Sequence, residues 1–117
     1  MQFHEVRYDS AQPVDSYGPG FFRVAGEVIE GPILVTAETA MGWGGLEDIA
    51  TLTALQGKID VLFLGMGPEI AHPPVPLREA LEEAGIGIEM MASAQACRTY
   101  NVLIAEGRRI ALAALPV

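Results

Sequence analysis

Residues 59–67, IDVLFLGMG, decide the fold class that this sequence predicts. Positions 59–64 form a short β-branched and apolar run, which is typical of a buried strand. Gly65 and Gly67 follow the run, as expected where a strand ends and the chain turns. Helix-like and strand-like patterns alternate after this point, so the run predicts the first strand of an α/β arrangement.

The elements predicted after this run are a helix over residues 77–84, a strand over 86–91, a helix over 94–105 and a strand over 109–115. Pro76 and Gly85 stand where they open and close the first helix. Ser93 is a candidate N-cap of the second helix. The last strand is nearly all apolar, which predicts an interior position in a sheet whose strands pair in parallel through right-handed crossovers.

The N-terminal third is predicted to be more antiparallel and hairpin-like. Residues 3–8 alternate with period two, which is typical of a strand. Gly57 stands where the C-cap of a helix over residues 46–55 belongs. The other predicted elements are strands over 21–25 and 32–37, a turn and short strand over 26–31, loops over 9–20 and 41–45, and a helix over 46–55. The whole chain, residues 1–117, is thus predicted to be one α/β domain with a mixed sheet.

Composition limits the classes of function. Half of the residues are hydrophobic and 19% are charged, which predicts an ordered domain. The apolar excess fits a subunit or partner interface and fits a well-filled core equally well. The net charge of −8 repels phosphate backbones, and only Arg98, Arg108 and Arg109 hint at a basic cluster, so nucleic-acid binding is not expected. Arg108 and Arg109 are interpreted as solvated charges in a turn.

The sequence predicts a cytoplasmic protein without a membrane span. A single cysteine cannot form an internal disulfide, which fits a reducing compartment. The N-terminus does not have the pattern of a signal or transit peptide, and no apolar run is long enough for a spanning helix. The two histidines and one cysteine offer no metal-ligand spacing, and no cofactor is expected.

Several motifs together resemble one known family. They are Tyr17-Gly18-Pro19-Gly20-Phe21, Gly31-Pro32-Ile33-Leu34-Val35, Trp43 in its loop, Leu62-Phe63-Leu64-Gly65-Met66-Gly67, Gly87-Ile88-Glu89-Met90-Met91, and Ala96-Cys97-Arg98-Thr99-Tyr100-Asn101-Val102-Leu103 with Glu106-Gly107-Arg108-Arg109. The chain is similar over almost its whole length to a small α/β domain family of unknown function. This family includes the mitochondrial NADH dehydrogenase assembly factor three and the adipogenesis-associated domain protein. The resemblance implies a three-layer α/β fold, no established enzymatic activity and, for the mitochondrial branch, assembly of respiratory complex I through protein partners.

The turn at Gly65 and Gly67 is one candidate pocket. Ligands of open parallel sheets bind at the carboxyl ends of the strands, and two glycines let the backbone approach an anion. A dinucleotide site is disfavoured because Ile70 replaces the third glycine of the fingerprint and prolines delay the helix. The alternatives that stay open are a small-anion pocket and a plain tight turn.

The predicted helix 94–105 carries the second candidate group, Cys97, Arg98 and Asn101. Helical spacing makes these side chains neighbours, and a thiol near a helix start and a cation is a candidate nucleophile if His72 reaches it as a base. The other histidine, His4, lies in the predicted first strand. In the alternative interpretation, Cys97 is a buried hydrophobe, Asn101 satisfies backbone groups of the loops at 41–45 or 65–68, and Arg98 pairs with Glu69 or Glu89.

Trp43 is a candidate interface residue, because a tryptophan among glycines can serve as a binding hot spot. The alternative is that it folds back over the sheet. These observations predict a non-catalytic protein-binding or assembly module, with self-association. The rival prediction is a small-anion-binding protein or enzyme built on Gly65 and Gly67 with Cys97, Arg98 and Asn101.

Overall fold

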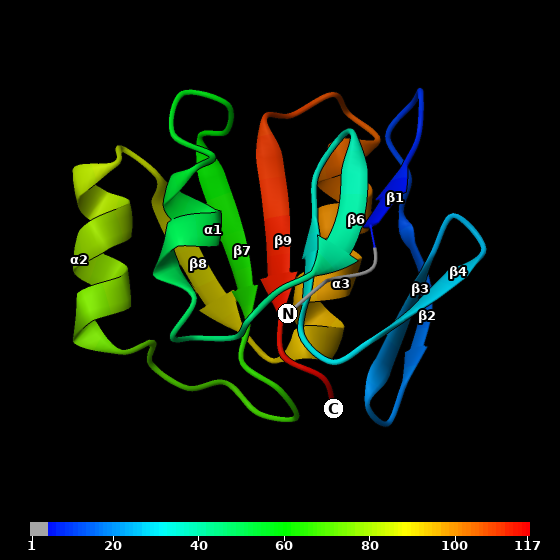
Figure 1. Ribbon diagram of the computed structural model, residues 1–117, viewed down its shortest axis with the longest axis horizontal. Coiled ribbons are helices and arrows are strands. Elements are labelled where there is room, and N and C mark those ends of the chain that lie inside the picture. Colours follow the sequence, from blue (N-terminus) through cyan, green and yellow to red (C-terminus); the bar gives the residue numbers. More distant parts are fainter. Residues whose placement is uncertain (1–4) are drawn as a thin grey trace.

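Two sheets and three helices make up the computed structural model, which describes residues 5–117 (Figure 1). The strands are β1 (Glu5–Arg7), β2 (Val14–Gly18), β3 (Phe21–Val24), β4 (Glu27–Glu30), β5 (Ile33–Val35), β6 (Thr39–Gly42), β7 (Val61–Gly65), β8 (Gly87–Met91) and β9 (Ile110–Ala114). The helices are α1 (Ile49–Thr53), α2 (Val75–Glu83) and α3 (Ser93–Ile104).

The larger sheet has six strands in the order β1-β6-β5-β9-β7-β8. Strand β9 lies at its centre, pairing in parallel with β7 on one side and antiparallel with β5 on the other. All five residues of β9 are buried, which explains why its sequence is apolar throughout. The prediction of a mixed sheet with parallel strands in the second half is confirmed.

Three layers result, as the family resemblance implies. Helix α3 and the small antiparallel sheet β2-β3-β4 cover one face of the large sheet, while α1 and α2 cover the other (Figure 1). Each interface has its own core: Phe22, Phe63 and Tyr100 are among the large side chains of the first, and Trp43, Leu62 and Leu81 of the second. Apolar residues therefore alternate between two buried faces along the central strands.

Two local predictions differ from the structure. Strand β2 lies inside the predicted loop 9–20. The sequence does not show this strand, because only Val14 of its five residues is buried and its other residues lack the apolar pattern of a strand that pairs with β3. Strand β6 overlaps the predicted loop 41–45, since pairing with both β1 and β5 outweighs its low intrinsic preference for strand. The predicted strand at 3–8 is observed as β1, and its positions 3 and 4 lie outside the described residues.

The helix ends also correct one prediction. Ser93 was expected to cap α3, but it is the first helical residue, and Ala92 is the N-cap without a side-chain capping bond. The hydroxyl of Ser93 has other partners, described below. Helix α1 is shorter than the predicted 46–55 and is capped by Asp48, whose carboxylate accepts from the Thr51 N–H at 3.4 Å. No helix among residues 5–117 has the length and apolarity needed to cross a membrane.

Candidate functional site

The turn after β7 packs directly against the start of α3. The Gly67 N–H donates to Oγ of Ser93 at 2.9 Å, and the Ser93 N–H donates to the Gly67 carbonyl at 2.8 Å. The Ser93 hydroxyl in turn donates to the carbonyl of Leu115. The Gly67 N–H, which would have to face an anion in a glycine-loop pocket, is therefore engaged in holding the fold together.

Gly65 allows this close packing. A Cβ at position 65 would lie 2.8 Å from Ser93 Oγ and 2.9 Å from Ser93 Cα. Gly67 has a φ of +94°, which L side chains rarely adopt, so this glycine permits the turn itself. The packing of the turn against α3 thus explains why glycine stands at both positions, without a ligand.

Cys97 and His72 lie in different surroundings. Cys97 is 3% exposed in the core between α3 and the large sheet, whereas His72 is exposed in the loop that leads to α2 on the opposite face. No hydrogen bond of the described residues joins the two side chains, and His4 lies outside those residues. Burial raises the pKa of the Cys97 thiol to about 11, and the charge of Arg98 lowers it by less. At neutral pH the side chain is therefore a protonated thiol.

Slow thiol–disulfide exchange at Cys97 is the expected result of this burial. A rise in pKa from 9.0 to about 11 lowers the thiolate fraction near neutral pH about 100-fold. Native protein should thus react with a disulfide reagent at least about 100-fold more slowly than protein in urea. Since Cys97 is the only cysteine, the release of the reagent's chromophore reports on it alone. Equal rates in the native and denatured states would contradict the buried position.

Arg98 and Asn101 have separate partners. The exposed guanidinium of Arg98 donates to Oε1 of Gln95 at 3.1 Å, and no ion pair among residues 5–117 joins it to Glu69 or Glu89. The Asn101 amide instead holds β2: Oδ1 accepts from the Val14 N–H at 2.8 Å, and Nδ2 donates to the Val14 carbonyl at 3.0 Å. The expected partners of Asn101 in the loops at 41–45 or 65–68 are thus replaced by a strand 87 positions away.

Replacing Asn101 by alanine is expected to lower the free energy of unfolding by about 1–3 kcal/mol. The change leaves a partly buried N–H and carbonyl of Val14 without their side-chain partner. Arg98→Ala in the same helix is the matched control, and its exposed side chain predicts a change within about 0.5 kcal/mol. Urea denaturation of both variants measures the difference. Equal effects would show that the amide pair with Val14 contributes nothing.

Trp43 lies in the core at 1% exposure. Its indole N–H donates to the carbonyl of Asp48 at 3.0 Å, and its ring packs with the cluster that includes Leu34, Leu52 and Leu64. The interpretation in which Trp43 folds back over the sheet describes this position. A partner cannot reach the ring without opening the α1 side of the core.

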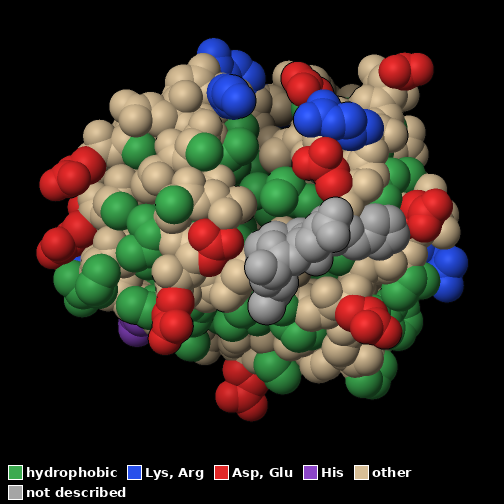
Figure 2. Space-filling view, in the orientation of Figure 1, with side chains coloured by type: hydrophobic (Ala, Val, Ile, Leu, Met, Phe, Trp, Pro, Cys, Tyr) green, Lys and Arg blue, Asp and Glu red, His purple; other side chains and the backbone are tan. Residues whose placement is uncertain are grey.

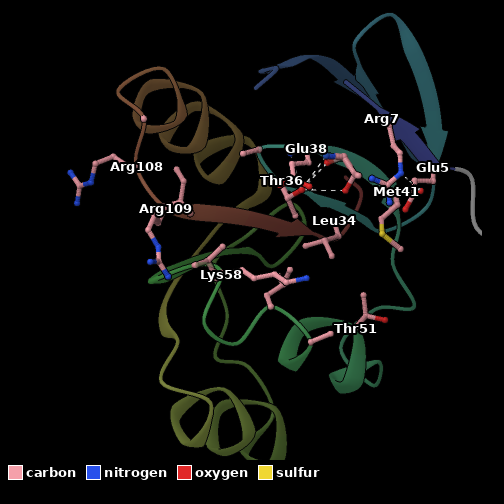
Figure 3. A pocket seen from close by; sticks show the side chains of 17 residues that line it. Glu5, Arg7, Leu34, Thr36, Glu38, Met41, Thr51, Lys58, Arg108 and Arg109 are labelled. Atoms are coloured by element: carbon pink, nitrogen blue, oxygen red, sulfur yellow. Dashed lines mark hydrogen bonds and ion pairs between the residues drawn. The ribbon is translucent and has the colours of Figure 1, made fainter. Parts of the chain in front are cut away.

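A hollow of the described surface lies between α1 and the β1-β6-β5 edge of the large sheet, and the sequence did not predict it (Figure 3). It has a volume of about 650 Å³. We call it the α1 groove. Apolar side chains of Leu34, Met41, Leu55 and Ile59 line it together with threonines and charged residues. Figure 2 shows it as a depression in the upper half of this face, with basic side chains gathered on either side.

Basic side chains concentrate in the α1 groove. Four of the seven Lys and Arg residues of the chain line it, namely Arg7, Lys58, Arg108 and Arg109. The acidic residues of the lining are Glu5 and Glu38, so four positive and two negative side chains give it a formal charge of +2 in a chain of net charge −8. The groove is thus a positive site on an otherwise acidic protein.

The four cations differ in how they are held. Arg7 pairs with Glu5 at 3.2 Å, and Arg109 donates to the Gly57 carbonyl at 2.8 Å and lies 3.6 Å from an oxygen of Asp60. Lys58 and Arg108 have no carboxylate within ion-pair distance among residues 5–117. Figure 3 shows the Lys58 amine reaching into the groove between Leu34 and Thr51, while the Arg108 guanidinium points away from it.

Only the fold collects these cations. Arg7 precedes β2, Lys58 follows α1, and Arg108 and Arg109 precede β9. The one signal in the sequence was the Arg108-Arg109 pair, which was interpreted as a solvated turn. Among residues 5–117, no three His, Cys, Asp or Glu side chains lie together as metal ligands would.

Comparison with known proteins places the chain among relatives of similar length and fold. A family model described as "Protein of unknown function (DUF498/DUF598)" matches residues 14–115. An uncharacterized protein of Rhodobacter capsulatus is 50% identical over 117 residues, which span all of this chain and 94% of that protein. The crystal structure of an outer membrane protein from Bartonella henselae is 34% identical and superposes with a TM-score of 0.84, covering 92% of this chain and 97% of that one.

Longer relatives carry the name of an assembly factor. NADH dehydrogenase [ubiquinone] 1 alpha subcomplex assembly factor 3 of Drosophila melanogaster is 34% identical over 113 residues. The match covers 88% of this chain and 58% of the fly protein. This chain therefore spans less than two thirds of the length of that factor. The predicted resemblance to the family that includes the assembly factor is confirmed.

Proposed function

We propose that this chain, which belongs to the DUF498/DUF598 family, is a protein-binding module that acts in the assembly of a respiratory NADH dehydrogenase. The observation that carries the proposal is the extent of the match to the assembly factor, which covers 88% of this chain. Because the shared region is nearly the whole domain, the module common to both proteins is the one described above.

The contacts around Gly67 and Cys97 support a non-catalytic role. The Gly67 N–H and the Ser93 hydroxyl bond to each other, and Asn101 bonds to Val14. Cys97 is a buried, protonated thiol. The groups required by the rival hypothesis, an enzyme or anion site at Gly65 and Gly67, are therefore engaged in folding, and we favour protein binding.

The proposal includes two finer expectations. The module acts in the cytoplasm on its partner, and it self-associates through apolar surface outside the α1 groove. Exposed apolar side chains that are available for self-association include Ile70 and Val75, which are 67% and 51% exposed beside α2. Sedimentation velocity of the purified chain tests the second expectation.

Deletion of the gene that encodes this chain tests the main proposal. We expect the deletion strain to lose fully assembled NADH dehydrogenase on native gels of its membranes, with the succinate dehydrogenase band unchanged. A plasmid copy of the gene should restore the band. Normal amounts of assembled enzyme in the deletion strain would overturn the proposal.

A further inference from the structure

We propose that the α1 groove binds a segment of the partner protein in which acidic residues alternate with apolar ones. The inference rests on the proposed function only in taking the occupant to be part of a protein. It names the chemistry of that occupant from the charges and the apolar lining of the groove.

Charge complementarity gives the sign of the occupant. Without Arg108, whose guanidinium points away, the side chains that line the groove carry +1 while the whole chain carries −8, so an acidic segment is attracted to this site and repelled by most of the remaining surface. A basic segment would be drawn to the rest of the molecule instead. The groove is therefore the place where this acidic protein can accept carboxylates.

The apolar lining indicates more than a small anion. Leu34 belongs to the core that α1 and α2 cover, Met41 and Leu55 pack against that core, and all three line the groove together with the cations. An inorganic anion would contact the cations and leave the exposed parts of the half-buried Met41 and Leu55 side chains in water. A segment with apolar side chains between its carboxylates covers both kinds of surface, and about 650 Å³ is within the range of specific ligand sites.

Lys58 is the cation best placed to receive a carboxylate of the segment. Its amine projects into the middle of the groove, and no carboxylate of residues 5–117 lies within ion-pair distance of it. Arg7 and Arg109 already interact with Glu5 and Asp60 and would share their charge with the segment. Because the Lys58 side chain is exposed and forms no hydrogen bond or ion pair among residues 5–117, changing it should have little effect on stability.

Fluorescence polarisation with synthetic peptides tests the chemistry. The probe is a labelled peptide of alternating Glu and Leu or Phe, and its control replaces each Glu by Gln. We expect the acidic peptide to bind at least about tenfold more tightly than the Gln peptide, and Lys58→Glu to weaken binding about tenfold. Arg23→Glu, on β3 of the small sheet, makes the same change in net charge outside the groove and should leave the affinity within about twofold.

Four outcomes would overturn the inference. The first is equal affinity for the two peptides, and the second is no measurable binding of either. The third is an equal loss of affinity in Lys58→Glu and Arg23→Glu. The fourth is full displacement of the peptide by inorganic phosphate at a concentration at which sulfate does not displace it. The third would indicate long-range attraction without a site, and the fourth a phosphate site. Thermal denaturation of both variants checks that they remain folded.

Cross-linking in cells identifies the occupant and separates the two proposals. A photoreactive amino acid at Ala54, which lines the groove, should capture a partner peptide rich in Asp, Glu and apolar residues, whereas the same group at exposed Glu79 of α2 should not. Suppose that deletion abolishes NADH dehydrogenase assembly and that a plasmid copy carrying Lys58→Glu restores it fully. The groove inference then fails and the proposed function stands. If deletion has no effect, the proposed function fails, and the capture at Ala54 still decides what the groove binds.

Discussion

Gly65→Ala is expected to lower the free energy of unfolding by about 3 kcal/mol or more. The new methyl group would lie 2.8 Å from Ser93 Oγ, 2.9 Å from Ser93 Cα and 3.0 Å from Ala114 Cβ. One of these neighbours is backbone, and β7 is held between β8 and β9, so the strand cannot move aside without disturbing both ladders. Overpacking and the loss of the Gly67–Ser93 hydrogen bond both contribute to the loss.

Gly87→Ala is the matched control for this prediction. Gly87 is the first residue of the neighbouring strand β8, and a Cβ there would meet its nearest atoms at 3.4 and 3.6 Å. We expect a change within about 0.5 kcal/mol. Urea denaturation followed by far-ultraviolet circular dichroism measures both variants. A Gly65→Ala protein as stable as Gly87→Ala would show that the β7–α3 junction is not closely packed.

Trp43→Ala is expected to lower the free energy of unfolding by about 3–5 kcal/mol. The change removes one of the largest fully buried side chains and leaves a cavity between α1 and the large sheet. It also removes the hydrogen bond from the indole N–H to the carbonyl of Asp48, the residue that caps α1. Helix α1 should loosen as a result, and with it one wall of the α1 groove.

Trp43→Phe separates the two contributions. Phenylalanine fills most of the space and loses the hydrogen bond, so its effect should be about 1–2 kcal/mol. Circular dichroism suits this series, because the variants lack tryptophan fluorescence. If Trp43→Ala were as stable as the parent and lost only partner binding, Trp43 would be a surface anchor and the described core position would be wrong.

The sequence predicted the second half of the fold better than the first. Regular alternation of helix and strand patterns after residue 59 follows from local propensity and from Pro76 and Gly85, so these elements lie close to the predicted bounds. Strands β2 and β6 were missed because tertiary pairing forms them: polar residues dominate β2, and β6 ends in a glycine-containing segment. The sequence predicted that β9 is an interior strand, since a fully apolar strand belongs inside a sheet, but it did not predict which strands flank it.

The functional surface was harder to predict than the fold. Spacing along α3 predicts that Cys97, Arg98 and Asn101 are neighbours, but it does not say which face each side chain takes or that Val14 is the partner of Asn101. The α1 groove depends on residues from positions 7 to 109 that approach only through the sheet order. No periodicity in a single sequence encodes that juxtaposition.

The central place of β9 constrains how the protein folds during synthesis. Strands β5, β6 and β1 form one half of the large sheet and β7 and β8 the other, and residues 110–114 are the seam that joins them. Until these residues emerge from the ribosome, each half displays an unpaired inner edge, the kind of surface that recruits chaperones or aggregates. A released chain that ends at Arg109 should thus remain sensitive to protease, whereas one that includes residues 110–114 should be resistant.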